Sequence, residues 1–262
     1  MGHQRLGTVP KTKKWDAVIA EVVDGRGLAS DDIAQIAVRT LEAAGPALER
    51  AVDDPGLRYT FYLLTQMVLA ARQDDWQAGL ARAGITLTDN SSIFDLTAQL
   101  QLAIDGHVAE HAQPTDISEM AQQAAGEALS TLAADNSVTL FGSDGESLRT
   151  AIKDLSTTKG FSRLGQTFFG RFTEKFLNFY LSRITAMRIG SDRLPTLDEI
   201  SRFNDALKLH CEQSARIARD FCGQWYSKTE YAEGIDVRNT SRFMAIALKK
   251  LSRELAKQRA DL

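Results

Sequence analysis

The chain has 262 residues, of which 44% are apolar and 25% are charged, and its formal net charge is −3 at pH 7. This composition is typical of a folded globular protein and excludes an intrinsically disordered one, because enough apolar side chains are present to form a core. The acidic balance, with an isoelectric point near 5.9, argues against DNA binding by the chain as a whole.

Charge is divided unevenly between the two halves of the chain. Residues 1–134 contain 10 lysines and arginines against 18 aspartates and glutamates, whereas residues 135–262 contain 21 against 16. The first half is therefore acidic and the second half basic. Such a distribution indicates a subunit that contacts its partners through charged surfaces, either another protein or further copies of itself.

No apolar segment reaches the length of a membrane span. Residues 61–71 form one of the longest apolar stretches, but Thr65 and Gln66 interrupt it, and a spanning helix needs roughly 20 residues. The first residues are polar and basic and lack the apolar core of a secretory signal. We expect a cytoplasmic protein without membrane contact.

Residues 1–14 are predicted to form a basic N-terminal arm that carries Lys11, Lys13 and Lys14, with Pro10 preventing an early helix. Apolar residues then recur at helical spacing, which predicts an acidic helical lobe over residues 15–134. Ser30 is a strong N-cap, whereas Gly45 and Pro46 are expected to kink or restart a helix. The expected helices of this lobe cover residues 15–23, 30–44, 57–72, 74–83, 93–112 and 115–134.

The turn-rich residues 136–145 form the expected boundary, since the charge balance changes sign there. A basic helical lobe is predicted over residues 143–262, with helices at 146–155, 160–187, 196–227 and 237–258. Residues 138–141 alone resemble a strand, and they are too few to trust. The sequence therefore predicts an all-α fold of about ten helices, a globular helical bundle formed as two closely packed lobes or as one domain.

Aromatic residues are concentrated in the predicted helix 160–187. Most of them fall on one stripe of that helix, which predicts that the helix packs in the core. The alternative is that the rings form an aromatic binding site for a ligand. The same helix begins with GFSRLGQT at 160–167, which mimics the spacing of a phosphate-binding P-loop. Gln166 stands where that motif requires lysine, so nucleotide hydrolysis is not expected. The aromatic residues concerned are Phe161, Phe168, Phe169, Phe172, Phe176, Phe179 and Tyr180.

The sequence HVAEH at residues 107–111 resembles the H-x-x-E-H pattern of inverzincin metallopeptidases. Residues four apart share a helix face, so His107 and His111 could bind one zinc ion while Glu110 activates its water. Glu119 or Asp116 could supply a third ligand. The alternative is that both histidines extend the apolar stripe of their helix and pack against a neighbouring helix. No cofactor is expected unless the zinc hypothesis holds.

The C-terminal helix is the most credible interaction element. Its basic residues fall within a stripe about 100° wide, separate from an apolar face that contains Met244, Leu248 and Leu251. The basic stripe could bind phosphates or the acidic face of a protein, or it could be a solvated helix end that complements the helix dipole. Its members are Arg238, Arg242, Lys249, Arg253 and Lys257.

Residues 223–228, GQWYSK, place a glycine before two large aromatic side chains in the predicted helix 196–227. Trp225, Tyr226 and Lys228 are candidate partner-binding residues, with closure of the core as the alternative.

Cys211 and Cys222 lie on the same predicted helix, about 16 Å apart, which is too far for a disulfide bond. Both cysteines are expected to be reduced and buried.

Three functions are compatible with these features. The first is a non-catalytic accessory or scaffold subunit of a larger cytoplasmic protein or nucleoprotein assembly, and it follows from the charge polarity and the lack of a coherent active site. The second is a nucleic-acid-associated module that uses the basic helix and arm. The third is a zinc-dependent hydrolase built on His107, Glu110 and His111.

Overall fold

The computed structural model describes residues 11–24, 30–135, 145–186 and 197–257. In these ranges it contains eleven helices and no β-strand, which confirms the predicted all-α fold. Residues 138–141, whose pattern resembles a strand, lie outside the described residues. The helices are α1 (Lys13–Asp24), α2 (Ser30–Ala51), α3 (Pro55–Ala70), α4 (Trp76–Arg82), α5 (Ile93–His111), α6 (Asp116–Asp135), α7 (Gly145–Asp154), α8 (Thr158–Ala186), α9 (Leu197–Ser214), α10 (Arg216–Ala232) and α11 (Val237–Lys257).

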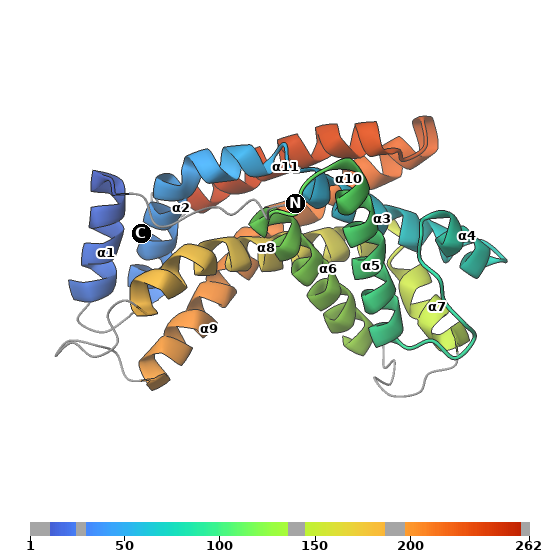
Figure 1. Ribbon diagram of the computed structural model, residues 1–262, viewed down its shortest axis with the longest axis horizontal. Helices are drawn as coiled ribbons and strands as arrows, with labels where there is room; N and C mark the ends of the chain where they lie inside the picture. The colour runs from blue at the N-terminus through green and yellow to red at the C-terminus, as the bar shows by residue number, and fades with distance from the viewer. Residues whose placement is uncertain (1–10, 25–29, 136–144, 187–196, 258–262) are drawn as a thin grey trace.

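Helix α8 crosses the middle of the molecule and is contacted by α6, α9 and α10. In Figure 1, α2, α10 and α11 lie above α8, whereas α9 descends on one side and α5, α6 and α7 descend on the other. Helix α3 lies between these groups and contacts both α6 and α11. The two chain halves therefore meet along α3 and α8.

The aromatic stripe of α8 lies in the core, as its spacing predicts. Phe161, Phe168 and Phe169 are fully buried, and their rings surround Phe61 of α3 at centroid distances of 6.0, 5.4 and 5.5 Å. Phe243 of α11 stacks on the same ring at 5.5 Å. Because apolar burial is the main driving force of folding, this cluster connects α3, α8 and α11.

A buried polar contact aligns the starts of α3 and α6. Asp54 is the N-cap of α3, where its side chain accepts a hydrogen bond from the N–H of Leu57 at 2.8 Å. The hydroxyl of Thr115 donates to the same carboxylate at 2.6 Å and also accepts the N–H of Ser118 at 2.9 Å. Thr115 thus caps the start of α6. Burial raises the pKa of Asp54, and the bond from Thr115 partly opposes that rise.

The helix predicted over residues 196–227 is in fact two helices, which accounts for eleven helices instead of ten. Ser214 Oγ donates to the carbonyl oxygen of His210 at 2.8 Å, a local bond that tends to bend helices. The N–H of Ala218 then bonds to Ala215 three residues back, at 2.8 Å. A Cβ at Gly170 of α8 would lie 3.5 Å from Ala215 Cβ, so α8 passes close to the break.

The two cysteines consequently lie on different helices, Cys211 on α9 and Cys222 on α10, and the single-helix argument against a disulfide bond is wrong. Both are free and buried, as expected. Burial raises the pKa of both thiols, so they remain protonated at neutral pH.

Helix α2 continues through Pro46 to Ala51 and does not restart there. Proline has no backbone N–H, so the carbonyl of Glu42, four residues earlier, loses its helical partner. The Lys14 ammonium of α1 donates to that carbonyl at 3.5 Å. This contact joins α1 to α2 at the position where Pro46 interrupts the backbone hydrogen bonds of α2.

One continuous hydrophobic core runs through helices from both halves of the described chain. Gln66 of α3 also donates to the carbonyl of Ile235 at 3.1 Å, and Arg149 of α7 donates to the carbonyl of Gln73 at 2.8 Å. The expected boundary at 136–145 lies outside the described residues except for Gly145, where α7 begins, so the division into two lobes stays a prediction. Within the described ranges, no helix combines the length and apolar character needed to cross a bilayer.

Candidate functional site

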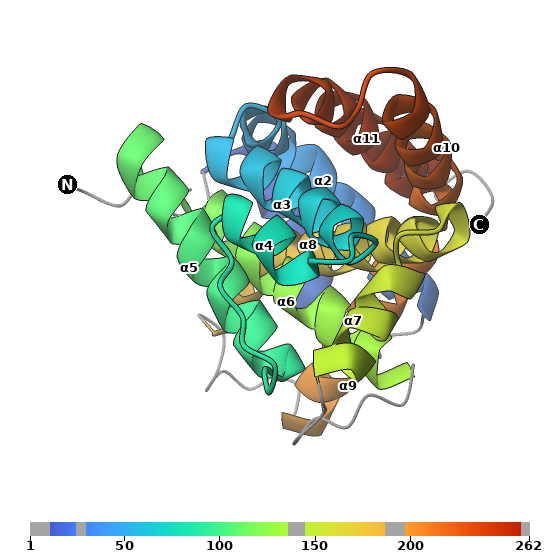
Figure 2. The same cartoon turned by 90° about the vertical axis from the view of Figure 1, so that its right-hand side faces the viewer.

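The cationic stripe of α11 faces solvent. Arg238, Arg242, Lys249 and Arg253 are exposed, and none of them forms an ion pair with another described residue. Arg238 and Arg253 are 15 residues apart, which corresponds to about 22 Å along the helix. Figure 2 shows α11 on the outer side of the molecule beside α10. Lys257 ends the helix, and its side chain lies outside the described part.

Opposite this stripe, α11 is fixed to the core. Phe243, Met244, Ala247, Leu248 and Leu251 are buried on the face that contacts α2, α3, α9 and α10. A reciprocal pair of hydrogen bonds at the start of the helix links Asp236 and Asn239, at 2.7 and 3.0 Å. Docking of the apolar face therefore determines which charged side chains remain in water.

An apolar residue interrupts the cationic stripe. Ile246 is 56% exposed and, at 100° per residue, projects beside Arg242 and Arg253 on the helix. Lys250 lies at the edge of the stripe with its ammonium 5.3 Å from the centre of the Phe221 ring. The α11 face, defined as Arg238, Arg242, Ile246, Lys249 and Arg253, thus combines positive charge with one exposed apolar contact.

The last residues of the predicted basic arm belong to a helix. Helix α1 already begins at Lys13, so Lys13 and Lys14 belong to its first turn, and Lys11 precedes it. All three are exposed, although Lys14 also contacts the carbonyl of Glu42. Trp15 is 1% exposed and lies 4.9 Å from the Tyr180 ring of α8. This segment is therefore anchored on the core at Trp15, which corrects the expectation of an unpacked arm up to that residue.

Of the candidate residues at 225–228, two belong to the core. Tyr226 is 1% exposed and stacks on Phe161 at 4.1 Å, so it cannot contact a partner in this structure. Trp225 is partly buried and stacks on Phe243 at 4.2 Å. Lys228 alone is exposed. The prediction of Tyr226 as a binding residue is wrong, because large aromatic rings here close the contact of α10 with α8 and α11.

The H-x-x-E-H residues occupy the last turns of α5. His107 stacks on Tyr59 of α3 with ring centroids 3.6 Å apart, and His111 stacks on His107 at 4.5 Å. The Nδ1 atom of His111 is directed at the carbonyl of His107, 3.1 Å away. Burial and the neighbouring His111 lower the pKa of His107.

Nothing completes a zinc site around these histidines. Within the described residues, no group of three His, Cys, Asp or Glu side chains is placed to hold a metal ion, so Glu119 and Asp116 do not join the pair. His107 is partly buried and packs on α3, as the alternative interpretation expects of both histidines, whereas His111 and Glu110 are exposed. The zinc hypothesis therefore has only the sequence pattern in its favour.

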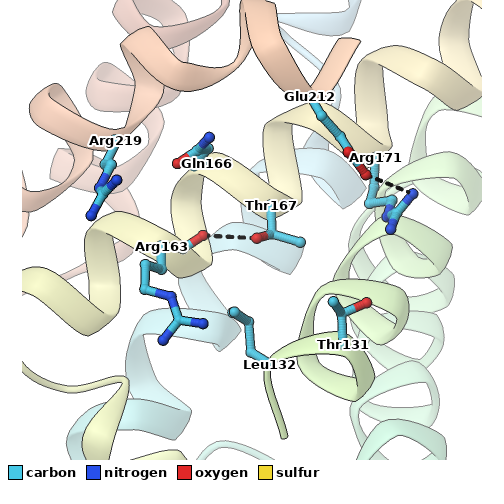
Figure 3. A pocket seen from close by; sticks show the side chains of 8 residues that line it. All are labelled: Thr131, Leu132, Arg163, Gln166, Thr167, Arg171, Glu212 and Arg219. Atoms are coloured by element: carbon cyan, nitrogen blue, oxygen red, sulfur yellow. Dashed lines mark hydrogen bonds and ion pairs between the residues drawn. The ribbon is translucent and has the colours of Figure 1, made fainter. Parts of the chain in front are cut away.

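A second candidate site is a cavity of about 300 Å³ among α6, α8, α9 and α10. Figure 3 shows its side chains, which include three arginines from two helices. Thr167 Oγ1 donates to the carbonyl of Arg163 at 3.0 Å, which keeps this turn of α8 compact. The lining consists of Thr131 and Leu132 from α6, Arg163, Gln166, Thr167 and Arg171 from α8, Glu212 from α9 and Arg219 from α10.

The arginines of this cavity differ in their surroundings. Arg171 is half surrounded by carboxylates, with its Nη1 atom 3.2 Å from Glu174 and 3.3 Å from Glu212. Its Nε atom lies 3.8 Å from Glu127. Arg219 is exposed and forms no ion pair within the described residues. Arg171 is therefore a structural cation between α6, α8 and α9, and Arg219 is the more accessible one.

The cavity was not predicted from the sequence, although the spacing of the polar residues of α8 indicates part of its lining. Arg163, Gln166, Thr167 and Arg171 recur at helical spacing on the side of α8 opposite its phenylalanines. Residues 160–167 lie within helix α8 and do not form a phosphate-binding loop. Arg219, by contrast, could not be associated with α8 from spacing, because it comes from another helix.

Comparison with protein-family models, with curated proteins and with solved structures finds no match to this chain.

Proposed function

We propose that this chain is a non-catalytic accessory or scaffold subunit of a larger cytoplasmic assembly, and that it binds an acidic protein surface through the α11 face. The observation that carries the proposal is the exposure of Ile246, at 56%, beside exposed Arg242, Lys249 and Arg253. Protein interfaces combine apolar anchors with charged surroundings, and the charges increase both association rate and specificity.

A protein partner is preferred over nucleic acid for two reasons. A phosphate backbone offers no apolar counterpart for Ile246, which lies along the edge of the face. The chain also has a net charge of −3, which repels a polyanion from the rest of the molecule. An acidic protein patch can meet the face locally, with ion pairs to its arginines and lysine and an apolar contact to Ile246 beside them.

Site-specific photo-cross-linking in the native source tests the proposal. A photoreactive residue at position 246 is expected to capture one defined protein, and the triple variant Arg242→Glu, Lys249→Glu, Arg253→Glu is expected to lose that product. A photoreactive residue at Leu102 of α5, which is 62% exposed, is the matched control and is expected to capture nothing specific. A monomeric chain without a cross-linked partner at position 246 contradicts the proposal.

Fluorescence anisotropy with duplex DNA or RNA over a salt series distinguishes a nucleic-acid partner from a protein partner. Binding that weakens with salt and disappears in the same triple variant would assign the α11 face to nucleic acid. If the anisotropy of the nucleic acid does not change when the chain is added, the acidic protein remains the proposed partner.

A further inference from the structure

We propose that the segment that binds the α11 face is an acidic amphipathic α-helix, which lies along α11 and places a row of glutamates against its basic residues. This inference rests on the proposed accessory role, because it names the kind of partner segment that the same face takes. Three features of the face support it: the spacing of its residues along the helix, the positions of its long and short side chains, and its place on the outer side of the molecule.

The residues of the α11 face recur at intervals of four, four, three and four positions. In an α-helix these intervals correspond to about 6, 6, 4.5 and 6 Å along the axis. A second helix that repeats the same intervals rises by the same distances. Each side chain on its stripe therefore stays opposite one residue of the face from Arg238 to Arg253.

An extended partner segment does not keep this register. Side chains on one side of a strand recur about every 6.7 Å, so over the roughly 22 Å of the face they fall about 4 Å out of step. Part of the extended backbone would also be covered by α11, whose own N–H and C=O groups are already paired within the helix. A helical partner pairs its own backbone groups and needs only side-chain contacts. The spacing therefore favours a helix.

The side-chain lengths of the face fit two crossing helices. Packed helices commonly cross at about 20° or about 50°, so their axes are closest at one point and diverge on both sides of it. Ile246 has the shortest side chain of the face and lies eight residues from Arg238 and seven from Arg253. The short side chain is thus near the middle of the length of the face, where the axes are closest. The long arginine side chains lie at the ends, where the gap is wider.

The face is accessible along its whole length. Met244, Leu248 and Leu251 are buried, and at 100° per residue they lie on the opposite side of the helix from the basic stripe. Figure 2 shows α11 on the outer side of the molecule, with α10 beside it. A partner helix can therefore lie along the face while the apolar side of α11 stays packed on the core.

Charge determines the chemistry of the partner. Four of the five residues of the face are basic and exposed, so the partner stripe is acidic, and glutamate is favoured because it is a good helix former. Opposite Ile246 the partner carries an apolar residue such as leucine. A contact between two single helices buries little surface compared with a stable interface, so the complex is transient and is weakened by salt.

Fluorescence anisotropy with labelled synthetic peptides tests the helical partner on the full chain. Two alanine-rich probes of about 18 residues, long enough to form a helix in isolation, carry four glutamates and one leucine at the spacing of the face, one probe for each chain direction. A third peptide has the same composition with its glutamates distributed around the helix. A fourth carries two prolines within the stripe, which prevent the helix. Circular dichroism checks the helicity of all four.

The two striped peptides represent opposite directions of the partner helix, and at least one of them is expected to bind about tenfold more tightly than the rearranged and the proline peptides. Its affinity is expected to fall severalfold between about 50 and about 300 mM salt, because exposed ion pairs are screened.

Variants of the chain locate the binding site. Ile246→Ala is expected to weaken binding of the striped peptide by about fivefold, because an apolar contact is lost. The triple variant Arg242→Glu, Lys249→Glu, Arg253→Glu is expected to abolish it. Leu102→Ala is the matched control, since it shortens another exposed apolar side chain, 62% exposed on α5, and is expected to leave the affinity unchanged.

Three results would overturn the helical partner. They are equal binding of the striped and rearranged peptides, equal binding of the proline peptide, and an unchanged affinity in Ile246→Ala. Each of them leaves the capture of a protein at position 246 possible, so the accessory role would stand while the helical partner falls. Loss of that capture with tight binding of a striped peptide would contradict the accessory role alone.

Discussion

Helices α8 and α11 are both long and amphipathic, yet they use their polar faces differently. The aromatic face of α8 is buried against α3 and α10, and its polar face is covered in part by α6 and α9, where it lines the cavity. Helix α11 buries one face, and Arg238, Arg242 and Arg253 remain in water on the other. Apolar faces therefore determine where both helices lie, and the neighbours of the polar faces determine what those faces can bind.

The largest expected effect comes from removing the ring at the centre of the shared core. Phe61→Ala is expected to lower the free energy of unfolding by about 3–5 kcal/mol, because a cavity forms where rings from α8 and α11 met. Urea unfolding followed by circular dichroism measures it. Phe94→Ala in α5, where the ring is 48% exposed, is the control and should change stability by less than about 0.5 kcal/mol.

A smaller loss is expected where α8 and α10 approach most closely. A Cβ at Gly165 would lie 2.4 Å from the sulfur and 2.7 Å from the Cβ of Cys222, so Gly165→Ala should cost about 1–3 kcal/mol of stability by forcing the helices apart. Gly126→Ala in α6 meets nothing within 4 Å and should stabilise the protein by about 0.5–1 kcal/mol. Equal effects of the two substitutions in urea unfolding would contradict the close contact.

Acid should weaken the core on the α9 side of α8. His210 is 8% exposed, and burial lowers its pKa from the ordinary value of 6.5. The unfolded chain therefore binds a proton on this histidine at a higher pH than the folded chain does. The contribution of neutral His210 to the free energy of unfolding is complete above pH 6.5, and it is lost as the pH falls toward the pKa of His210 in the folded chain.

The variant His210→Leu isolates this contribution. Relative to the variant, the wild-type chain should lose up to about 1.4 kcal/mol per pH unit as the pH falls below 6.5. His107, whose pKa is also lowered, is present in both chains and cancels in the difference. A stability difference that stays constant between pH 7.5 and pH 5 would contradict the burial of a neutral His210.

The smallest stability effect is expected on α11. Replacing Arg238, Arg242 and Arg253 together by glutamine should leave the free energy of unfolding within about 0.5 kcal/mol, because exposed charges without ion pairs contribute little to stability. The same variant should lose the protein captured at position 246. A large loss of stability in urea unfolding would mean that the α11 face is part of the fold and not a free surface.

Periodicity predicted the helices well where burial follows the local pattern. The stripe from Phe161 to Tyr180 was assigned to the core from its spacing, and the structure places it there. The break at Ala215 was missed because it depends on Ser214, whose hydroxyl bonds within the helix, and on the close passage of Gly170 from α8. His107 was similarly ambiguous, because its stacking partner Tyr59 is on another helix.

By itself the sequence determined the all-α class, the buried face of each long helix and the basic character of the second half, because helical period and net charge are local properties. Only the tertiary structure decided that Arg163 and Arg219 line one cavity and that Tyr226 is buried while Ile246 is exposed. These outcomes depend on which helices pack together, and contacts between residues far apart in the chain carry no local spacing signal. The cavity at α8 and the free face of α11 are consequences of that packing.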